Sequence, residues 1–266
     1  MTAAPLLTVS ALTIRFGGLT AIEDLSLEVR EGEVLALIGP NGAGKTSAFN
    51  AITGYLAPSG GEIVFGGVRL NGLKPHRIAE LGLVRTFQKT SVFSGRSALE
   101  NILIGLHLRA TQTPLAILLG LSAVAREEEQ LEVEAREILA FAGLGARAHD
   151  LAGALPYGEQ RLLEIAVALA AKPRLLLLDE PVSGMNAVET ESFMAKLTEI
   201  RALGITVLLV EHDMKMVMSV SDRIVCLSQG RVIASGTPGE IQRDPEVIRA
   251  YLGESYARNK EAHSRA

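Results

Sequence analysis

A glycine-rich segment near the amino terminus has the residue types and spacing that hold a phosphate. It matches the pattern G-x-x-x-x-G-K-[ST], and glycines there let the backbone curl so that successive N–H groups face one anion. In that pattern the lysine reaches the β and γ phosphates, and the last hydroxyl binds Mg²⁺. We therefore predict a site for the phosphates of a nucleotide and Mg²⁺. Its residues, with the one that follows, are Gly39, Pro40, Asn41, Gly42, Ala43, Gly44, Lys45, Thr46 and Ser47.

A second candidate for chemistry is a pair of adjacent acids, Asp179 and Glu180, after a run of leucines at 175–178. Such a run predicts a buried parallel strand, with both acids at its carboxyl end. Burying neighbouring acids is costly unless a cation or strong hydrogen bonds compensate. A Mg²⁺ shared with Thr46 would be that cation, bound by Asp179 directly or through water, while Glu180 polarises the attacking water. Taken alone, the pair is also compatible with two solvated acids.

Two further side chains follow predicted strands, and ligands gather at such strand ends in open α/β sheets. Gln88 comes directly after a strand that ends at Phe87, and His212 comes after the apolar run 205–210. We expect His212 to contact the γ-phosphate. Phe16, in the first predicted strand, is either a core residue or an aromatic ring that stacks on adenine.

Hydrophobic periodicity predicts the elements that position these residues. The region from about 89 to 172 has a helical pattern, and Gly158 begins one of its helices, which offers a second phosphate-facing terminus. We predict an α/β fold with a small antiparallel sheet beside a nucleotide-binding core. The predicted strands are 6–16, 25–29, 34–38, 62–65, 68–70, 84–87, 175–178, 205–210, 222–227 and 231–234. Helices are expected at 47–52, in a short segment from 76, at 97–108 and 126–139, from the segment 155–160 through 170, and at 189–203.

Composition excludes several classes of protein. Apolar residues make up 48% of the 266 residues and charged residues 21%, which permits a sizeable core. A net charge of −4 gives no basic field for a nucleic-acid partner. The single cysteine, Cys226, excludes an internal disulfide and suits a reducing compartment. The longest apolar stretch, 115–125, is too short for a membrane span, so any membrane role is expected to come through partners.

The order of these motifs along the chain resembles the ATP-binding subunit of an ABC transporter, and the resemblance covers nearly the whole sequence. It implies a phosphate-loop (RecA-like) nucleotide core with an antiparallel β subdomain and an inserted α-helical subdomain. That subdomain would span about 89–172 of one ATP-binding domain at 6–254, followed by a polar tail at 255–266. The motifs are Gly39–Thr46, Gln88, Leu155–Glu159, Asp179-Glu180, Ser183–Asn186 and His212.

The resemblance also implies roles for individual residues. Phe16 corresponds to the aromatic residue that stacks on adenine, and Gln88 to the glutamine that joins the Mg²⁺ and water site to the membrane subunit. Residues 183–186 correspond to the crossing loop, which in that family reaches a partner cassette, and His212 corresponds to the switch histidine. The signature segment, which completes the partner's ATP site, consists of Leu155, Pro156, Tyr157, Gly158 and Glu159.

Other segments look like the ATP-binding subunits of branched-chain amino acid importers, although relatives that import urea, amides or other solutes share them. The implied partners are membrane permease subunits, a second ATP-binding chain (related or identical) and, indirectly, a solute-binding protein. The implied location is the cytoplasmic face of the inner or plasma membrane, as a peripheral subunit. These segments are Arg85–Gln88, Tyr157–Arg161, His212–Lys215 and Val247–Gly253.

The signature segment departs from the usual Leu-Ser-Gly-Gly-Gln. Pro156 stands at the serine position and has neither a hydroxyl nor an N–H. Phosphate contacts must then come from Gly158, Glu159 and the helix start, and Glu159 disfavours binding unless it points to solvent or pairs with a cation. Asn186 stands where aspartate is usual. Either departure could lower turnover at the site that this segment completes.

Two other classes remain as alternatives. The first is a soluble ABC ATPase. Members that act in DNA repair carry a long coiled coil between the phosphate loop and the signature segment, whereas this chain has a modest helical insert. Members that act in translation usually carry two cassettes in one chain, whereas this chain has one. A non-catalytic regulatory ATP binder would not need the intact set of Lys45, Asp179, Glu180 and His212.

Overall fold

The computed structural model describes residues 5–86, 92–106 and 122–251. The chain divides into two compact units. The first unit contains residues up to Arg85, Arg174–Glu180 and the chain from Leu197 on; the second contains Thr86–Pro173 and Pro181–Lys196.

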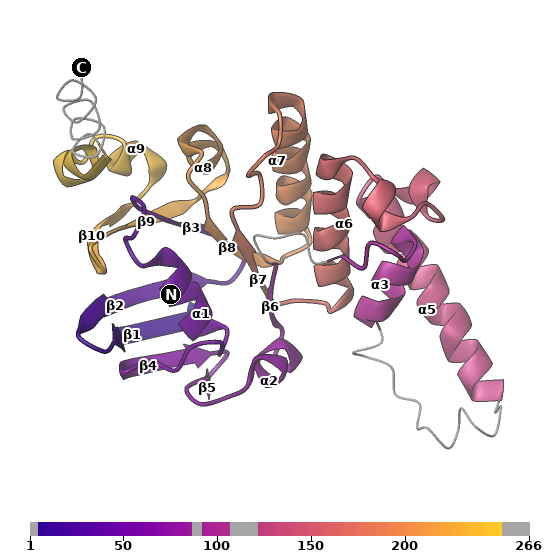
Figure 1. The fold of residues 1–266 in the computed structure, drawn as a ribbon, viewed down its shortest axis with the longest axis horizontal. Coiled ribbons are helices and arrows are strands. Elements are labelled where there is room, and N and C mark those ends of the chain that lie inside the picture. The colour runs from indigo at the N-terminus through magenta and orange to yellow at the C-terminus, as the bar shows by residue number, and fades with distance from the viewer. Residues whose placement is uncertain (1–4, 87–91, 107–121, 252–266) are drawn as a thin grey trace. The chain divides into compact units, whose positions relative to one another are not determined.

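The larger sheet of the first unit has six strands in the order β10-β9-β3-β8-β7-β6 (Figure 1). Neighbours from β9 to β6 pair in parallel, and β10 pairs antiparallel to β9. Every residue of β3, β7 and β8 is buried, as expected for strands covered on both faces. The strands are β3 (Val34–Ile38), β6 (Leu83–Arg85), β7 (Leu175–Asp179), β8 (Thr206–Val210), β9 (Arg223–Ser228) and β10 (Arg231–Gly236).

The smaller sheet is antiparallel, with the order β2-β1-β4-β5 (Figure 1). In the second half of β2, buried residues alternate with exposed ones because one face of the sheet packs on the core. That core includes Leu25, Leu35, Phe49 and Leu177, so both sheets of this unit share one apolar interior. The strands are β1 (Pro5–Phe16), β2 (Leu19–Arg30), β4 (Gly60–Phe65) and β5 (Val68–Arg69).

The second unit has a helical core of its own. Leu99 and Ile102 of α3, Leu139 of α5 and Leu163 of α6 belong to one buried cluster. The α-helices of the first unit are α1 (Lys45–Ile52), α2 (Pro75–Glu80), α8 (Met214–Val220) and α9 (Pro238–Ile241). Those of the second are α3 (Ala98–Leu106), α5 (Ser122–Phe141) and α6 (Tyr157–Ala170), and α7 (Ala187–Ala202) runs from the second unit into the first.

The predicted α/β class with a separate antiparallel sheet is confirmed, and two details differ. The hairpin expected from residues 222–227 and 231–234 is confirmed as β9 and β10, but β9 was not expected to pair in parallel with β3 as well, which places it inside the sheet. Helix α8 was not predicted, since its seven residues are too few for a clear helical period. Of the expected features, Gln88, residues 115–121 of the apolar stretch 115–125, and the tail 255–266 lie outside the described residues. In the described parts of the chain, no helix has the length and apolarity that crossing a bilayer requires.

Candidate functional site

The predicted phosphate loop, residues 39–46, connects β3 to α1 and depends on glycine at two positions. Gly39 has φ +152°, and a Cβ there would lie 2.2 Å from the carbonyl oxygen of Leu227. Gly44 has φ +102°, and a Cβ there would lie 2.6 Å from the carbonyl oxygen of Ala21. A side chain at either position would collide with backbone, so the glycines are required by close packing as well as by conformation.

Neighbouring elements brace the loop through backbone hydrogen bonds. The N–H of Gly230, in the turn between β9 and β10, donates to the carbonyl of Ala43 at 3.1 Å. The carbonyl of Gly230 accepts from the N–H of Glu23 in β2 at 2.9 Å. The turn at Gly230 thus links the loop to the antiparallel sheet. Sequence reasoning placed a turn here and missed its contact with the loop.

Lys45 is buried and turned onto its own loop. Its Nζ donates to the carbonyl oxygens of Gly39 at 2.6 Å and Pro40 at 3.1 Å. Among the described side chains none caps α1, whose preceding residue is Gly44. The first N–H groups of a helix have no partner within it, so this uncapped terminus suits an anion. Thr46, in the first turn, is exposed and accessible to a ligand.

Asp179 ends β7 and forms a buried ion pair with Arg85 at the end of β6. Arg85 Nη2 lies 2.7 Å from Asp179 Oδ2, and each side chain is only 7% exposed. The negative charge of the buried Asp179 is therefore compensated by Arg85, a residue that was not predicted to have this role. The two are 94 residues apart, and no local pattern links them.

Glu180 occupies an unusual backbone conformation. Its φ is +48°, in the left-handed region that side chains with a Cβ rarely adopt. Its N–H donates to the carbonyl of Val210, the last residue of β8, at 2.8 Å. Strain of this kind persists where surrounding structure fixes it, and it is frequent at functional sites.

His212 follows the end of β8, as predicted, on a backbone fixed by the buried Glu211. The Glu211 carboxylate accepts from the N–H groups of His212 at 2.7 Å and Asp213 at 3.1 Å. The His212 side chain is 63% exposed, and its Nδ1 lies 3.4 Å from Glu211 Oε2. Its ring can therefore meet a ligand while its backbone stays in place.

The sheet order gathers these groups at one edge. Strands β3, β8, β7 and β6 are parallel neighbours, so their carboxyl ends lie along the same edge of the sheet (Figure 1). The groups at these ends are the phosphate loop after β3, His212 after β8, Asp179 and Glu180 at the end of β7, and Arg85 at the end of β6. Phe16 ends β1 and is 48% exposed, which leaves its ring accessible. Its stacking on adenine stays a prediction, as does the role of Gln88.

The donor set at this edge is compatible with Mg²⁺. The Thr46 hydroxyl and the Asp179 carboxylate are oxygen ligands, and Mg²⁺ usually takes one or two carboxylates together with phosphate oxygens and water. The described residues contain no cluster of three or more His, Cys, Asp or Glu suited to a metal.

In the second unit, the signature segment begins α6. Pro156 precedes the helix, and none of the described side chains caps it. The Tyr157 hydroxyl donates to the carbonyl oxygen of Ser183 at 2.9 Å and accepts from Nε of Arg161 at 3.0 Å. Arg161 is buried and paired with Glu164 at 2.8 Å. Tyr157, at a position where glycine is usual, therefore links the signature segment to the crossing loop.

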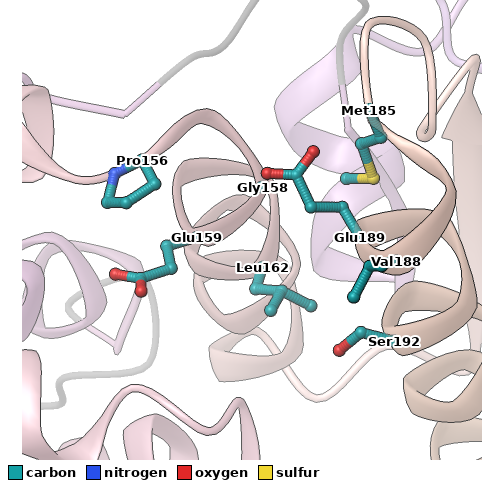
Figure 2. Close-up of a pocket in the computed structure, with 8 residues that line it drawn as sticks. All are labelled: Pro156, Gly158, Glu159, Leu162, Met185, Val188, Glu189 and Ser192. Carbon is teal, nitrogen blue, oxygen red and sulfur yellow. The ribbon is translucent and has the colours of Figure 1, made fainter.

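A cavity of about 280 Å³ lies between the start of α6 and the start of α7 (Figure 2). Gly158 lines it, and a Cβ there would lie 2.9 Å from the Glu189 carboxylate. Glu159 pairs with Arg147, Nε to Oε2, at 3.4 Å. In Figure 2 the Glu159 carboxylate points away from Glu189. Of the three orientations considered for Glu159 (toward the phosphates, toward solvent, or paired with a cation), the structure has the one paired with a cation.

Asn186 of the crossing loop caps α7. Its Oδ1 accepts from the N–H groups of Val188 at 2.9 Å and Glu189 at 3.0 Å. In return, the Glu189 carboxylate accepts from the N–H of Asn186 at 2.9 Å. This reciprocal capping box gives Asn186 a structural role at the start of α7. The replacement of the usual aspartate by asparagine did not predict that role.

Comparisons with known proteins agree with this geometry. Residues 22–183 match a family model described as ABC transporter, and residues 231–257 match one described as branched-chain amino acid ATP-binding cassette transporter. The chain is 46% identical over 252 residues to the high-affinity branched-chain amino acid transport ATP-binding protein BraF of Pseudomonas aeruginosa, covering 94% of this chain and 99% of that one. With the same coverage, it is 43% identical to the protein LivG of Escherichia coli.

Solved structures give the same result. An ATP-binding cassette of an ABC transporter in its ADP conformation matches with a TM-score of 0.83 and 31% identity, over 94% of this chain and all of that one. A dimeric ATP-binding cassette bound to ADP and phosphate matches with a TM-score of 0.73 and 25% identity, over 87% of this chain and 98% of that one. The chain belongs to the ABC transporter family, in which it is an ATP-binding cassette.

Proposed function

We propose that this chain hydrolyses ATP to power the import of branched-chain or related amino acids through a membrane ABC transporter. The observation that carries the proposal is the sheet edge at which the phosphate loop, Asp179, Glu180 and His212 follow neighbouring parallel strands. The names of BraF and LivG supply the transported solute, and both align over almost their whole length. An importer of urea, amides or another solute is the second candidate.

In this proposal the nucleotide is bound mainly by the phosphate loop. Lys45 exchanges its two loop carbonyls for phosphate oxygens, and the uncapped N–H groups of α1 face the same phosphates. Thr46, Asp179 and Gln88 would hold Mg²⁺, which when bound neutralises phosphate charge. The accessible ring of Phe16 stacks on the adenine.

Hydrolysis needs positioning and charge stabilisation more than covalent chemistry by the protein. Glu180 orients a water and accepts its proton as the water oxygen bonds to the γ-phosphorus. The bond from that phosphorus to the bridging oxygen breaks, which yields ADP and inorganic phosphate. His212, exposed on a backbone fixed by Glu211, braces the γ-phosphate.

The signature segment acts on the ATP of a second cassette, in a head-to-tail pair with two-fold symmetry, true or approximate. The uncapped start of α6 and the dimeric relative support this arrangement. Because Pro156 lacks a hydroxyl and an N–H, the contact comes from Gly158 and the helix terminus. The partner is a related chain or a second copy.

Coupling to transport places the chain at the cytoplasmic face of the membrane, bound to permease subunits. The helical subdomain and the region of Gln88 contact those subunits, and a solute-binding protein takes part indirectly. A domain spanning 6–254, with a helical insert at about 89–172 and a separate tail, is part of the same proposal.

The catalytic part is tested by Glu180→Gln. The variant should bind ATP like the parent but hydrolyse it roughly 10²- to 10⁴-fold more slowly, since it loses the group that handles the water's proton. Binding is measured with a fluorescent ATP analogue and turnover by phosphate release. Glu191→Gln, at an exposed position on α7, is the matched control and should keep parental turnover. Normal hydrolysis by Glu180→Gln would refute the assignment.

The transport part is tested by purifying the tagged chain from its own membranes. Permeases and a second ATP-binding chain should accompany it, and the reconstituted complex should take up labelled leucine in an ATP-dependent manner. Uptake of urea or an amide instead would support the second candidate. Recovery of soluble partners alone, in conditions that preserve a control transporter, would leave the ATPase standing and remove the transport role.

A further inference from the structure

Arg85 makes a set of contacts that reaches beyond its ion pair with Asp179. Its Nη1 donates to Asn50 Oδ1 at 2.7 Å and to Thr53 Oγ1 at 3.3 Å, while its Nη2 donates to Asp179 Oδ2 at 2.7 Å. Its guanidinium carbon lies 5.6 Å from the ring centre of Phe49. Asn50 and Phe49 belong to α1, and Thr53 follows it, so one buried side chain contacts both this helix and the strand that carries the acid.

Through these contacts Arg85 connects the elements that carry Thr46 and Asp179, the two described residues proposed as Mg²⁺ ligands. Helix α1 begins with Lys45 and Thr46, and Asp179 ends β7. A guanidinium is planar and presents its donors in a rigid fork, so it fixes the relative position of the groups it bonds. Arg85 bonds one oxygen of Asp179, and a carboxylate has a second oxygen with which to face a cation.

We propose that Arg85 is a positioning residue for the metal site, which sets the orientation of Asp179 relative to the helix that carries Thr46. The inference rests on the proposed function, because that function makes Asp179 a Mg²⁺ ligand. Partners that orient a metal ligand change metal affinity roughly 10- to 100-fold when they are removed. Arg85 should therefore act on Mg²⁺-dependent nucleotide binding and leave metal-free binding alone.

A purely structural ion pair would behave differently, and the same unit contains one for comparison. Arg223 Nη2 lies 2.8 Å from Glu33 Oε1, with side chains 23% and 10% exposed. Glu33 precedes β3 and Arg223 begins β9, so this pair lies at the amino ends of parallel strands, away from the edge that carries the phosphate loop. Its loss should lower stability without changing the response to Mg²⁺.

The experiment measures equilibrium binding of a fluorescent ATP analogue, first in EDTA and then through a Mg²⁺ titration, in a Glu180→Gln background that suppresses hydrolysis. Arg85→Met should need roughly 10- to 100-fold more Mg²⁺ for the metal-dependent gain in affinity. Its affinity in EDTA should stay within about twofold of the parent, since Lys45 and the loop still bind the phosphates. Arg223→Met should titrate like the parent.

Arg85→Lys decides the matter if Arg85→Met does not fold. Lysine keeps the buried charge but lacks the fork, so it cannot bond Asp179 and Asn50 with the same geometry, and its Mg²⁺ requirement should also rise several-fold. A folded Arg85 variant with the parental titration, or a shift equal to that of Arg223→Met, overturns the proposal. An Asp179→Asn variant with the parental Mg²⁺ response would instead refute the metal site on which the proposal rests.

Discussion

Lys45 in this structure bonds two carbonyls of its own loop, and these bonds keep a buried ammonium group satisfied. When a nucleotide binds, the same group can exchange them for phosphate oxygens. Hydrogen bonds with charged partners contribute about 1.5–3 kcal/mol each, so Lys45→Ala should weaken ATP binding roughly 10- to 100-fold. Equilibrium titration measures this; Lys172→Ala, which removes an exposed lysine paired with Glu134, is the control. Unchanged affinity in Lys45→Ala would exclude the phosphate-loop role.

Cys226 illustrates burial acting on a reactive group. The pKa of its thiol is raised from 9.0 to about 11, first by burial and then by the negative charge of Asp244, while the positive charge of Lys45 partly opposes the shift. Because the thiolate is the reactive form, iodoacetamide at pH 8 should modify the folded protein far more slowly than the unfolded chain. Intact-mass measurement with and without denaturant checks this on a chain with a single cysteine. Stability should fall as pH rises from 9 towards 11, since only the unfolded chain then releases the proton.

At the scale of the element, helix α7 depends on Asn186. Asn186→Ala removes the acceptor for two N–H groups at the helix start and should destabilise the protein by about 1 kcal/mol. Asn186→Asp keeps the acceptor and adds a negative charge at the positive end of the helix, so it should retain the parental stability or exceed it slightly. Urea denaturation distinguishes the two, and equal losses in both variants would show that capping is not what matters here.

The link between α6 and the crossing loop gives a second prediction at this scale. Tyr157→Phe removes the hydroxyl that bonds the Ser183 carbonyl and Arg161, and should destabilise the protein by about 1–2 kcal/mol. ATP affinity should be unchanged, because the variant leaves the phosphate loop intact, whereas turnover should fall as the signature segment and the crossing loop lose their connection. Parental turnover would mean that this connection serves stability alone.

Contacts between elements far apart in the chain are the part of the site that local sequence patterns do not predict. The phosphate loop, the Asp179-Glu180 pair and the buried strands each consist of consecutive residues, so local sequence patterns predicted them. The pair Arg85 and Asp179, 94 residues apart, and the pair Tyr157 and Ser183, 26 apart, form only when the chain folds. Arg85 lies in a predicted strand and in a segment that resembles amino acid importers, but neither observation indicates that it pairs with Asp179. The order of the strands in the sheet places Arg85 beside Asp179, and the same order places β9 inside the sheet.

At the scale of the whole molecule, the proposal requires that ATP bring two cassettes together. The Glu180→Gln variant, which should retain ATP, is expected to dimerise when ATP and Mg²⁺ are added and to be monomeric with ADP. Light scattering after size exclusion measures the mass. Adding Lys45→Ala should abolish the effect by weakening the nucleotide site. If Glu180→Gln stays monomeric at saturating ATP, the cassettes pair through the permease rather than through nucleotide.

The left-handed backbone at Glu180 has a consequence for how the sequence responds to selection. A residue with a Cβ in such a conformation costs about 1–3 kcal/mol, a strain that glycine avoids. Glu180→Gly should therefore melt at a higher temperature than the parent while losing hydrolysis. A library of variants at position 180, screened for heat resistance with no demand for ATP turnover, should become enriched in glycine. The same library selected for growth on an imported amino acid should keep glutamate.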